Sequence, residues 1–304
     1  MKNILICKIG ALGDVVRTTP ILRVLKGNIF WVTSKEAFEI LPKIKNLKIL
    51  TPEKIFYVER FNFDLILNLE EDESLAKKIS MLKTKKLIGV YFDFKENKIF
   101  YTKESEKWYD MSLISKYGKK RADFLKWKNR KSYQEILFEM IGKKFKGEEY
   151  WLNYKIYKRK KIKNFLVAIE KRAGKTWPMK VWPYYDKLRR KLEKEGYKVF
   201  YLKQRKSLLD YIKDIDKASI LICGDTLAMH LGLYLKKRVI ALFLCTSPWE
   251  IYDYNRMEKI INPYLKEAFY RRDFEEKLVK GISVEKVFKA FQKVVNNLKP
   301  LHLK

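Results

Sequence analysis

The sequence is poor in cysteine and histidine, and these shortages limit its chemistry. It contains three cysteines and two histidines among 304 residues. Cys7, Cys223 and Cys245 all stand in apolar, strand-like runs without the spacing of metal ligands, so we expect buried thiols and neither a disulfide nor a zinc site. No carboxylate pair or histidine cluster has ligand spacing. We therefore expect metal-independent chemistry with no cofactor.

Long hydrophobic runs are also missing. The longest nearly pure apolar run, from Val239 to Cys245, is far shorter than the roughly 20 residues that cross a bilayer. The short apolar run after Lys2 breaks at Lys8, which argues against a signal peptide. Since 47% of the residues are hydrophobic, the chain is expected to fold. These features predict a cytoplasmic globular protein without a transmembrane helix.

Basic residues greatly outnumber acidic ones. The sequence has 67 Lys and Arg against 36 Asp and Glu, which gives a net charge of +31. Such an excess attracts polyanions, whether nucleic acid, an anionic lipid surface or a phosphorylated substrate. A general bias toward lysine at solvated positions explains part of it. Charge alone does not choose among these partners.

Strands alternate with helices in both halves of the chain, which predicts parallel sheets and the α/β class. We expect two Rossmann-like domains, at 1–150 and 164–304, joined by a lysine-rich linker over 151–163. Ser283 is predicted to cap a final helix, for which we consider packing back toward the first domain. The predicted strands are 4–7, 29–33, 65–69, 87–91, 165–169, 198–202, 220–223 and 239–244.

Residues 92–131 break this alternation, and we expect them to be irregular and basic. From Lys116 to Lys131 the sequence has eight basic residues and one acid, with Tyr117, Phe124 and Trp127 among them. Three interpretations stay open. The segment grips nucleic acid by stacking, binds an anionic acceptor or bilayer surface, or is a solvated loop anchored by its aromatic side chains.

The segment Lys8-Ile-Gly-Ala-Leu-Gly-Asp14 reads as the end of a strand, a tight turn and the start of a helix. Gly10 and Gly13 allow the backbone to bend sharply and to approach a ligand closely. Asp14 is expected at the carboxyl end of the strand, where open α/β sheets bind ligands. A purely structural interpretation is that the glycines form the turn and Asp14 caps the helix.

Three segments together resemble glycosyltransferase family 9, the bacterial lipopolysaccharide heptosyltransferases. They are the first twenty residues, Thr176-Trp-Pro-Met-Lys-Val-Trp-Pro183, and Gly224-Asp-Thr-Leu-Ala-Met-His230 with the later Thr246-Ser-Pro248. The resemblance implies a GT-B architecture, in which two Rossmann-like domains face each other across a cleft. It also implies an acceptor-side first domain and a second domain that binds the nucleotide sugar.

The resemblance further implies an inverting glycosyltransferase that moves heptose from ADP-heptose to a lipopolysaccharide core acceptor of the Kdo-lipid A type. Asp14 is then the general base, with Gly13 beside it at the substrate, whereas the rival carboxylates Asp110 and Asp123 follow no strand end. The partners are a nucleotide-sugar donor, an anionic glycolipid and, by charge, the inner-leaflet membrane surface, where the protein is peripheral. Alternatives are another nucleotide sugar for a different glycan, or a non-catalytic polyanion-binding protein; nucleic acid is not favoured.

Donor binding is assigned to residues of the second domain. Lys180 is the candidate diphosphate clamp, and the Thr176 hydroxyl donates to the same oxygens. Backbone amides at the start of the helix that follows Asp225 are expected to bind phosphate. The residues that supply them are Thr226, Leu227 and Ala228.

Two donor-side residues keep alternative roles. Asp225 either caps this helix or binds a sugar hydroxyl as well, and His230 either contacts the donor or packs in the core. Lys175, Leu227 and the residues before Thr246 depart from the family pattern, so the donor class is better supported than the donor itself.

Overall fold

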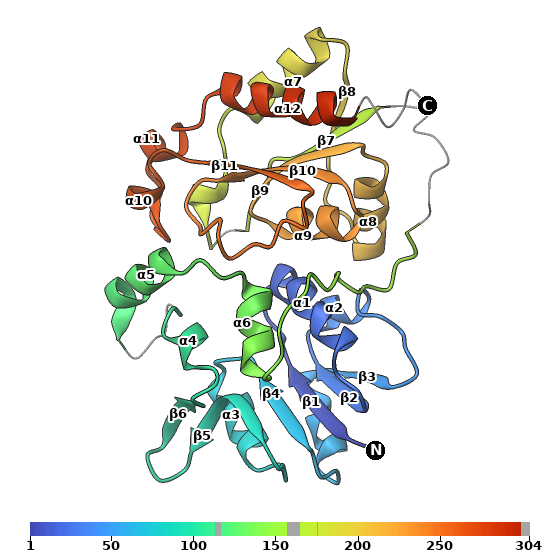
Figure 1. The fold of residues 1–304 in the computed structure, drawn as a ribbon, viewed down its shortest axis with the longest axis vertical. Coiled ribbons are helices and arrows are strands. Elements are labelled where there is room, and N and C mark those ends of the chain that lie inside the picture. The colour runs from blue at the N-terminus through green and yellow to red at the C-terminus, as the bar shows by residue number, and fades with distance from the viewer. Residues whose placement is uncertain (113–116, 157–164, 175, 299–304) are drawn as a thin grey trace. The chain divides into compact units, whose positions relative to one another are not determined.

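The computed structural model describes residues 1–112, 117–156, 165–174 and 176–298 (Figure 1). The chain divides into two compact units, Met1–Tyr154 and Lys155–Lys304. The division falls inside the predicted linker 151–163, of which residues 157–163 lie outside the described part. Each unit is built on its own sheet of mainly parallel strands, so the predicted α/β class is confirmed.

The first unit contains a six-stranded sheet in the order β3-β2-β1-β4-β5-β6. All neighbouring strands are parallel except β5 and β6, which are antiparallel. Cys7 at the end of β1 lies opposite Val32 and Asn68, so the loops that follow β1, β2 and β4 leave the sheet at one edge. The strands are β1 (Asn3–Cys7), β2 (Asn28–Val32), β3 (Leu47–Leu50), β4 (Leu65–Asn68), β5 (Leu87–Asp93) and β6 (Lys98–Tyr101).

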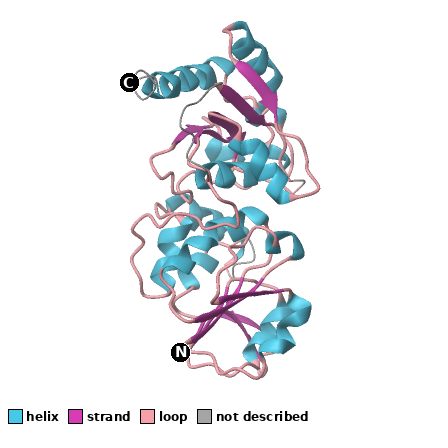
Figure 2. Cartoon of the chain, turned by 90° about the vertical axis from the view of Figure 1, so that its right-hand side faces the viewer, coloured by secondary structure: helices cyan, strands magenta, loops and turns pink. Residues whose placement is uncertain are grey.

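Helices cover both faces of this sheet (Figure 2). Because successive strand residues point to opposite faces, Ile4 and Ile6 of β1 pack with α1 and α6, while Leu5 and Cys7 pack with η2 and α3. The helices are α1 (Leu12–Thr18), η1 (Thr19–Arg23), α2 (Lys35–Phe38), η2 (Pro52–Val58), α3 (Glu73–Ser80), α4 (Glu106–Tyr109), α5 (Gly118–Lys128) and α6 (Tyr133–Met140).

The prediction that residues 92–131 are irregular is wrong. β5 continues to Asp93, whose carboxylate accepts hydrogen bonds from the next turn, and β6 returns beside it as an edge strand. The turn contains Asn97 at a positive φ of 50°, without the Asn-Gly pair that signals a hairpin. α4 and α5 follow. α5 has no apolar stripe, since its two buried residues are Ala122 and Lys126, and the sequence pattern therefore concealed it.

The second unit contains a five-stranded parallel sheet in the order β11-β10-β9-β7-β8. The edge strand β11 and helix α8 were not predicted. The strands are β7 (Leu166–Glu170), β8 (Lys198–Tyr201), β9 (Ile220–Gly224), β10 (Arg238–Phe243) and β11 (Met257–Ile261). The helices are η3 (Pro178–Lys180), α7 (Tyr185–Lys194), α8 (Leu208–Asp216), α9 (Leu227–Tyr234), α10 (Leu265–Ala268), α11 (Glu276–Val279) and α12 (Val284–Leu298).

The final helix, α12, packs within the second unit. Its apolar residues, among them Val287 and Phe291, join the core formed by α7 and the sheet. The Ser283 hydroxyl accepts a hydrogen bond from the Lys286 amide at 3.2 Å, so the predicted cap is confirmed. The apolar side of α12 is thus occupied in its own unit, and packing toward the first domain stays a prediction.

The three cysteine thiols are free and buried, as predicted. Burial raises the pKa of the Cys7 and Cys223 thiols well above the ordinary value, which keeps them protonated and unreactive at neutral pH. Over the described residues, no helix combines the length and apolar character that a membrane crossing demands.

Candidate functional site

Asp14 lies in the first turn of α1, close to the carboxyl end of the central strand β1. The turn between them depends on Ala11, whose φ of 39° is positive, whereas Gly10 and Gly13 do not have positive φ. The Ala11 carbonyl accepts hydrogen bonds from the amides of Asp14 at 2.7 Å and Val15 at 3.2 Å. The bend that was assigned to the two glycines is therefore made at Ala11, and Asp14 sits inside the helix instead of capping it.

The Asp14 carboxylate is held from its own helix. Arg17 Nη2 lies 2.9 Å from Asp14 Oδ1, and the Asp14 side chain is 35% exposed. The Arg17 guanidinium is itself buried against aromatic rings, 4.1 Å from the Tyr133 centroid and 5.5 Å from that of Trp108. The Tyr133 hydroxyl lies 2.8 Å from Thr18 Oγ1. Arg17 therefore fixes one carboxylate oxygen of an otherwise accessible acid.

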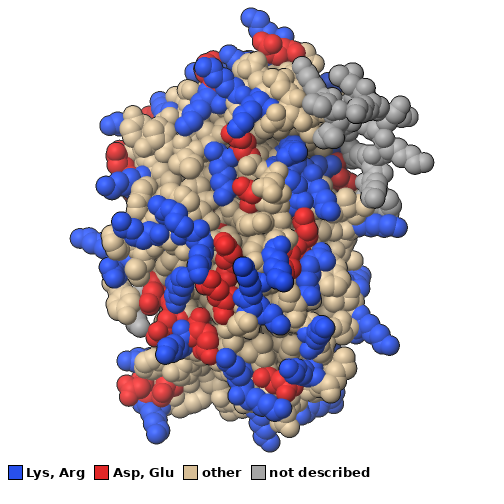
Figure 3. All heavy atoms as spheres, viewed as in Figure 1, with Lys and Arg blue, Asp and Glu red and all other residues tan. Residues whose placement is uncertain are grey.

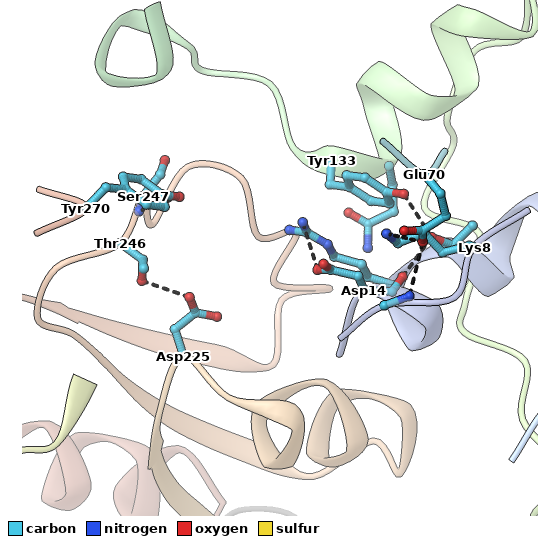
Figure 4. Close-up of polar contacts among 12 residues, drawn as sticks. Lys8, Asp14, Glu70, Tyr133, Asp225, Thr246, Ser247 and Tyr270 are labelled. Carbon is cyan, nitrogen blue, oxygen red and sulfur yellow. Dashed lines mark hydrogen bonds and ion pairs between the residues drawn. The ribbon is translucent and has the colours of Figure 1, made fainter. Parts of the chain in front are cut away.

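A second carboxylate, that of Glu70, organises the turn before Asp14 (Figure 4). Glu70 Oε1 accepts hydrogen bonds from Lys8 Nζ at 2.8 Å, the Ile9 amide at 2.6 Å and the Gly10 amide at 3.1 Å. Burial alone would lower the pKa of Lys8, but the nearby Asp14 and Glu70 carboxylates raise it above its ordinary value. Lys8 is therefore a fixed cation beside Asp14.

Sequence reasoning missed Glu70. A signal was available, because Glu70 closely follows β4 (Leu65–Asn68), which is adjacent and parallel to β1. The carboxyl ends of neighbouring parallel strands meet at one edge of a sheet, where ligands of α/β proteins bind. The rival candidates lie apart from strand ends: Asp110 follows α4, and Asp123 within α5 pairs with Lys119.

In the second unit, Lys180 is bonded to Asp225. Lys180 Nζ donates to the Asp225 carbonyl and to Asp225 Oδ2, both at 2.9 Å. The Thr246 hydroxyl donates to Oδ2 at 2.7 Å (Figure 4). Burial would raise the pKa of Asp225, but the charges of Lys180 and His230 and the hydrogen bonds from Lys180 and Thr246 lower it to about 2. This carboxylate is therefore ionised at neutral pH.

The turn after β9 brings Asp225 to the start of α9. The helix begins at Leu227 and its N-cap is Thr226, so Asp225 lies one residue before the cap and is not the cap that the sequence suggested. Thr226 Oγ1 makes no capping bond and is a buried atom without a hydrogen-bond partner. The amides of Leu227 and Ala228 stand in the first turn, where helix amides lack acceptors within the helix. The arrangement suits an anion.

Of the other predicted donor-side residues, Thr176 lies in the loop before Lys180 and His230 lies in the core. Thr176 is exposed in the loop that leads into η3, and Lys175 lies outside the described residues. His230 is buried in α9, where its charge affects Asp225. The structure thus brings Lys180, Asp225 and the newly recognised Thr246 into direct contact, and leaves Thr176 outside that contact.

Two further polar groups were not predicted. The Ser247 amide donates a hydrogen bond to the Tyr270 hydroxyl at 3.4 Å, and the Ser247 hydroxyl is buried without a hydrogen-bond partner. The Tyr270 ring lies 5.5 Å from that of Trp177, in the loop that carries Lys180. These residues link the loops after β7 and β10, both of which leave the carboxyl edge of the second sheet.

The chain has the GT-B-like fold of family 9 glycosyltransferases. It is similar over 97% of its length to a family 9 glycosyltransferase from Veillonella parvula, with a TM-score of 0.67, 16% identity and 98% of that chain covered. The ADP-heptose lipopolysaccharide heptosyltransferase II of E. coli gives a TM-score of 0.63 at 12% identity, covering 98% of this chain and 100% of that one.

A third similar structure is the E. coli heptosyltransferase WaaC with ADP-2-deoxy-2-fluoro heptose. It covers 96% of this chain and 99% of its own, with a TM-score of 0.54 and 11% identity. No family model matches the sequence, and no curated protein matches it by sequence. The likeness therefore establishes the fold, and the residues of this chain indicate its chemistry.

Proposed function

We propose that the protein is an inverting glycosyltransferase that moves heptose from ADP-heptose to a lipopolysaccharide core acceptor, with Asp14 as the general base. The observation that carries the proposal is the accessible Asp14 carboxylate at the carboxyl edge of the first sheet, oriented by Arg17 at 2.9 Å. Similar structures that bear the names of heptosyltransferases support the choice of donor.

The reaction requires a base for the acceptor hydroxyl and positive charge for the departing diphosphate. The acceptor hydroxyl gives its proton to a base as its oxygen attacks the anomeric carbon, and the bond from that carbon to the diphosphate breaks. The partly exposed Asp14 carboxylate takes the proton, and the fixed cation Lys8 beside it opposes premature protonation. Attack opposite to the leaving group inverts the anomeric centre.

The departing diphosphate needs donors that stabilise its negative charge. In the second unit the Thr226 hydroxyl and the first-turn amides of α9 meet this need. Lys180 already makes two bonds to Asp225. We therefore assign Lys180 a shared role, in which it positions Asp225 and supplies positive charge to the diphosphate. Asp225 then binds sugar or ribose hydroxyls.

The proposed acceptor is an anionic glycolipid of the Kdo-lipid A type, and the protein then works peripherally on the inner face of a membrane. The net charge of +31 favours both partners.

The test is calorimetric binding of ADP-heptose, ADP, UDP-glucose and GDP-mannose at two salt concentrations. We expect the adenine compounds to bind preferentially and ADP-heptose to be turned over with a Kdo-lipid A acceptor. Binding of a different nucleotide sugar would identify another glycosyltransferase. If no nucleotide sugar binds and a nucleic acid binds with a steep salt dependence, the polyanion-binding alternative is correct instead.

A further inference from the structure

Helix α5 (Gly118–Lys128) presents a basic face with an aromatic residue at its centre. It follows α4 in the first unit (Figure 1) and contains five basic residues and one acid, Asp123. Asp123 is paired with Lys119 in the preceding turn. The remaining positive charge of the helix is therefore not neutralised by its own acid.

The inner side of α5 is anchored to the first unit. Ala122 is fully buried, Leu125 packs against the core, and Lys126 is buried with its Nζ 6.0 Å from the Trp108 ring. Residues at spacings of three and four share a helix face. Because 122, 125 and 126 point inward, the face around 120, 121, 124 and 128 points away from the core.

That outer face combines one ring with three cations. Phe124 is 48% exposed, and Lys120, Arg121 and Lys128 are exposed around it. The Arg121 guanidinium lies 5.3 Å and Lys128 Nζ 5.8 Å from the ring centroid. A single exposed apolar side chain is ordinary on a protein surface. The informative feature is a ring that is surrounded by cations on an anchored helix.

Charge alone does not select this face. Figure 3 shows Lys and Arg side chains spread over the whole visible surface. Docking on an anionic bilayer uses more than positive charge, because the bilayer interface offers negative headgroups together with an apolar layer that admits an aromatic ring. The exposed Phe124 ring can enter that apolar layer, while the long basic side chains beside it keep their charges at the headgroups.

We infer that the outer face of α5 docks the protein on an anionic lipid bilayer, with Phe124 inserted and Lys120, Arg121 and Lys128 at the headgroups. The inference deepens the proposed function, whose acceptor is a membrane glycolipid, and it rests on that function only for the reason to dock. Lipid binding itself is measured without donor or acceptor.

The first experiment measures co-sedimentation of the full chain with phosphatidylcholine vesicles, with and without phosphatidylglycerol. A basic residue near an anionic surface contributes about fivefold to partitioning. We expect Lys120→Gln, Arg121→Gln and Lys128→Gln together to weaken binding to the anionic vesicles by more than about tenfold. The matched control is Lys187→Gln, Lys194→Gln and Lys198→Gln, three exposed residues of the second unit with the same loss of charge. Equal losses in the two triple variants would overturn docking at α5.

A second experiment follows the ring. Phe124→Ser is expected to weaken vesicle binding by about fivefold, since it removes the apolar contact, whereas Phe274→Ser, at an exposed phenylalanine of the second unit, is expected to change it little. The native cysteines are buried, so Phe124→Cys takes a polarity-sensitive dye selectively. Its emission should shift to the blue on vesicles, and the same dye at Phe274→Cys should not respond. No shift at position 124 would overturn insertion.

The remaining outcomes separate this inference from the proposed function and from another partner. ADP-heptose binding by the α5 variants is expected to equal that of the wild type. Failure at the vesicles with intact donor binding removes only the docking inference, and the reverse result removes only the proposed function. Binding of a single-stranded oligonucleotide that depends on Phe124, with no vesicle binding, would assign the face to nucleic acid instead.

Discussion

Asp14 and Asp225 occupy comparable places in the two units, and their surroundings give them different chemistry. Each lies where a central parallel strand gives way to a helix, β1 to α1 and β9 to α9. The Asp14 side chain is 35% exposed with one oxygen held by Arg17. That of Asp225 is 15% exposed, and a lysine and a threonine both donate to the same oxygen. The sheet topology places each carboxylate after a central strand, and the neighbouring side chains determine whether that carboxylate can exchange a proton.

The comparison predicts which aspartate acts as the base. An accessible carboxylate can take a proton from an incoming hydroxyl, whereas one with its pKa lowered to about 2 is a poor base and a good fixed anion. We therefore expect the two positions to divide the work, with proton transfer at Asp14 and binding at Asp225. Each prediction below alters one member of this pair or its support.

The largest effect is expected at Asp14. Asp14→Asn keeps the shape and removes the base, so we expect kcat to fall by about 10² to 10⁴-fold with ADP-heptose affinity unchanged. Steady-state kinetics and calorimetry measure the two quantities. Asp110→Asn is the control and is expected to retain turnover. A nearly normal kcat for Asp14→Asn would reject Asp14 as the base.

Loss of the lysine that holds Asp225 should be the next largest effect. Lys180→Ala leaves an ionised, mostly buried carboxylate without its cation, so we expect the free energy of unfolding to fall by about 3 kcal/mol. Urea denaturation measures the change. The matched control is Lys191→Ala, which breaks a more exposed pair with Glu285 and should cost less than about 1 kcal/mol.

The coupling can be isolated by a double variant. If Lys180 acts through Asp225, then Lys180→Ala should cost much less in the Asp225→Asn background than in the wild type. Equal costs in both backgrounds would show that Lys180 stabilises the unit by packing alone. In that case Lys180 would not explain why Asp225 differs from Asp14.

The pH dependence of stability gives a third test, of intermediate size. The folded-state pKa of Asp225, about 2, is below the ordinary aspartate value of 3.8. Its contribution is therefore fully present above about pH 4 and is lost as the pH falls toward 2. A shift of this size corresponds to about 2 kcal/mol. We expect the difference in unfolding free energy between wild type and Asp225→Asn to shrink by that amount over this window. A constant difference would contradict the lowered pKa.

Much of the fold could be predicted from sequence because strand and helix periods are local. The buried runs that form β1, β4, β9 and β10 were found with ends shifted by a residue or so. The errors fall where the signal is weak: β6 and β11 are edge strands with charged residues, and α5 turns Ala122 and Lys126 inward. Packing against the rest of the unit, and not local pattern, determines these elements.

The candidate site was predictable in its positions but not in its pairings. Asp14 and Asp225 were identified from motifs that follow predicted strands, and Lys180 from the family resemblance of its segment. The bond between Lys180 and Asp225 joins residues 45 positions apart, and the Thr246 bond spans 21. Such contacts depend on which loops the sheet order brings together. The contact between Lys180, the predicted diphosphate clamp, and Asp225 follows from that order.

The smallest expected effect concerns Glu70, which supports Asp14 from β4. Glu70→Gln keeps an acceptor for the Ile9 and Gly10 amides but removes the charge that pairs with Lys8. We expect a loss of about 1 to 2 kcal/mol in the free energy of unfolding, together with a lower kcat, because the turn before Asp14 loosens.

The control for Glu70 is Glu73→Gln, which breaks an exposed pair with Lys77 within α3 and should cost about 0.5 kcal/mol or less. A positioning role predicts that kcat falls for Glu70→Gln while the affinity for ADP-heptose, bound by the other unit, is kept. If stability falls and kcat does not, Glu70 serves only the fold. The orientation of the Asp14 carboxylate would then not depend on Glu70, and the contrast with Asp225, which Lys180 and Thr246 hold from two other loops, would be sharper.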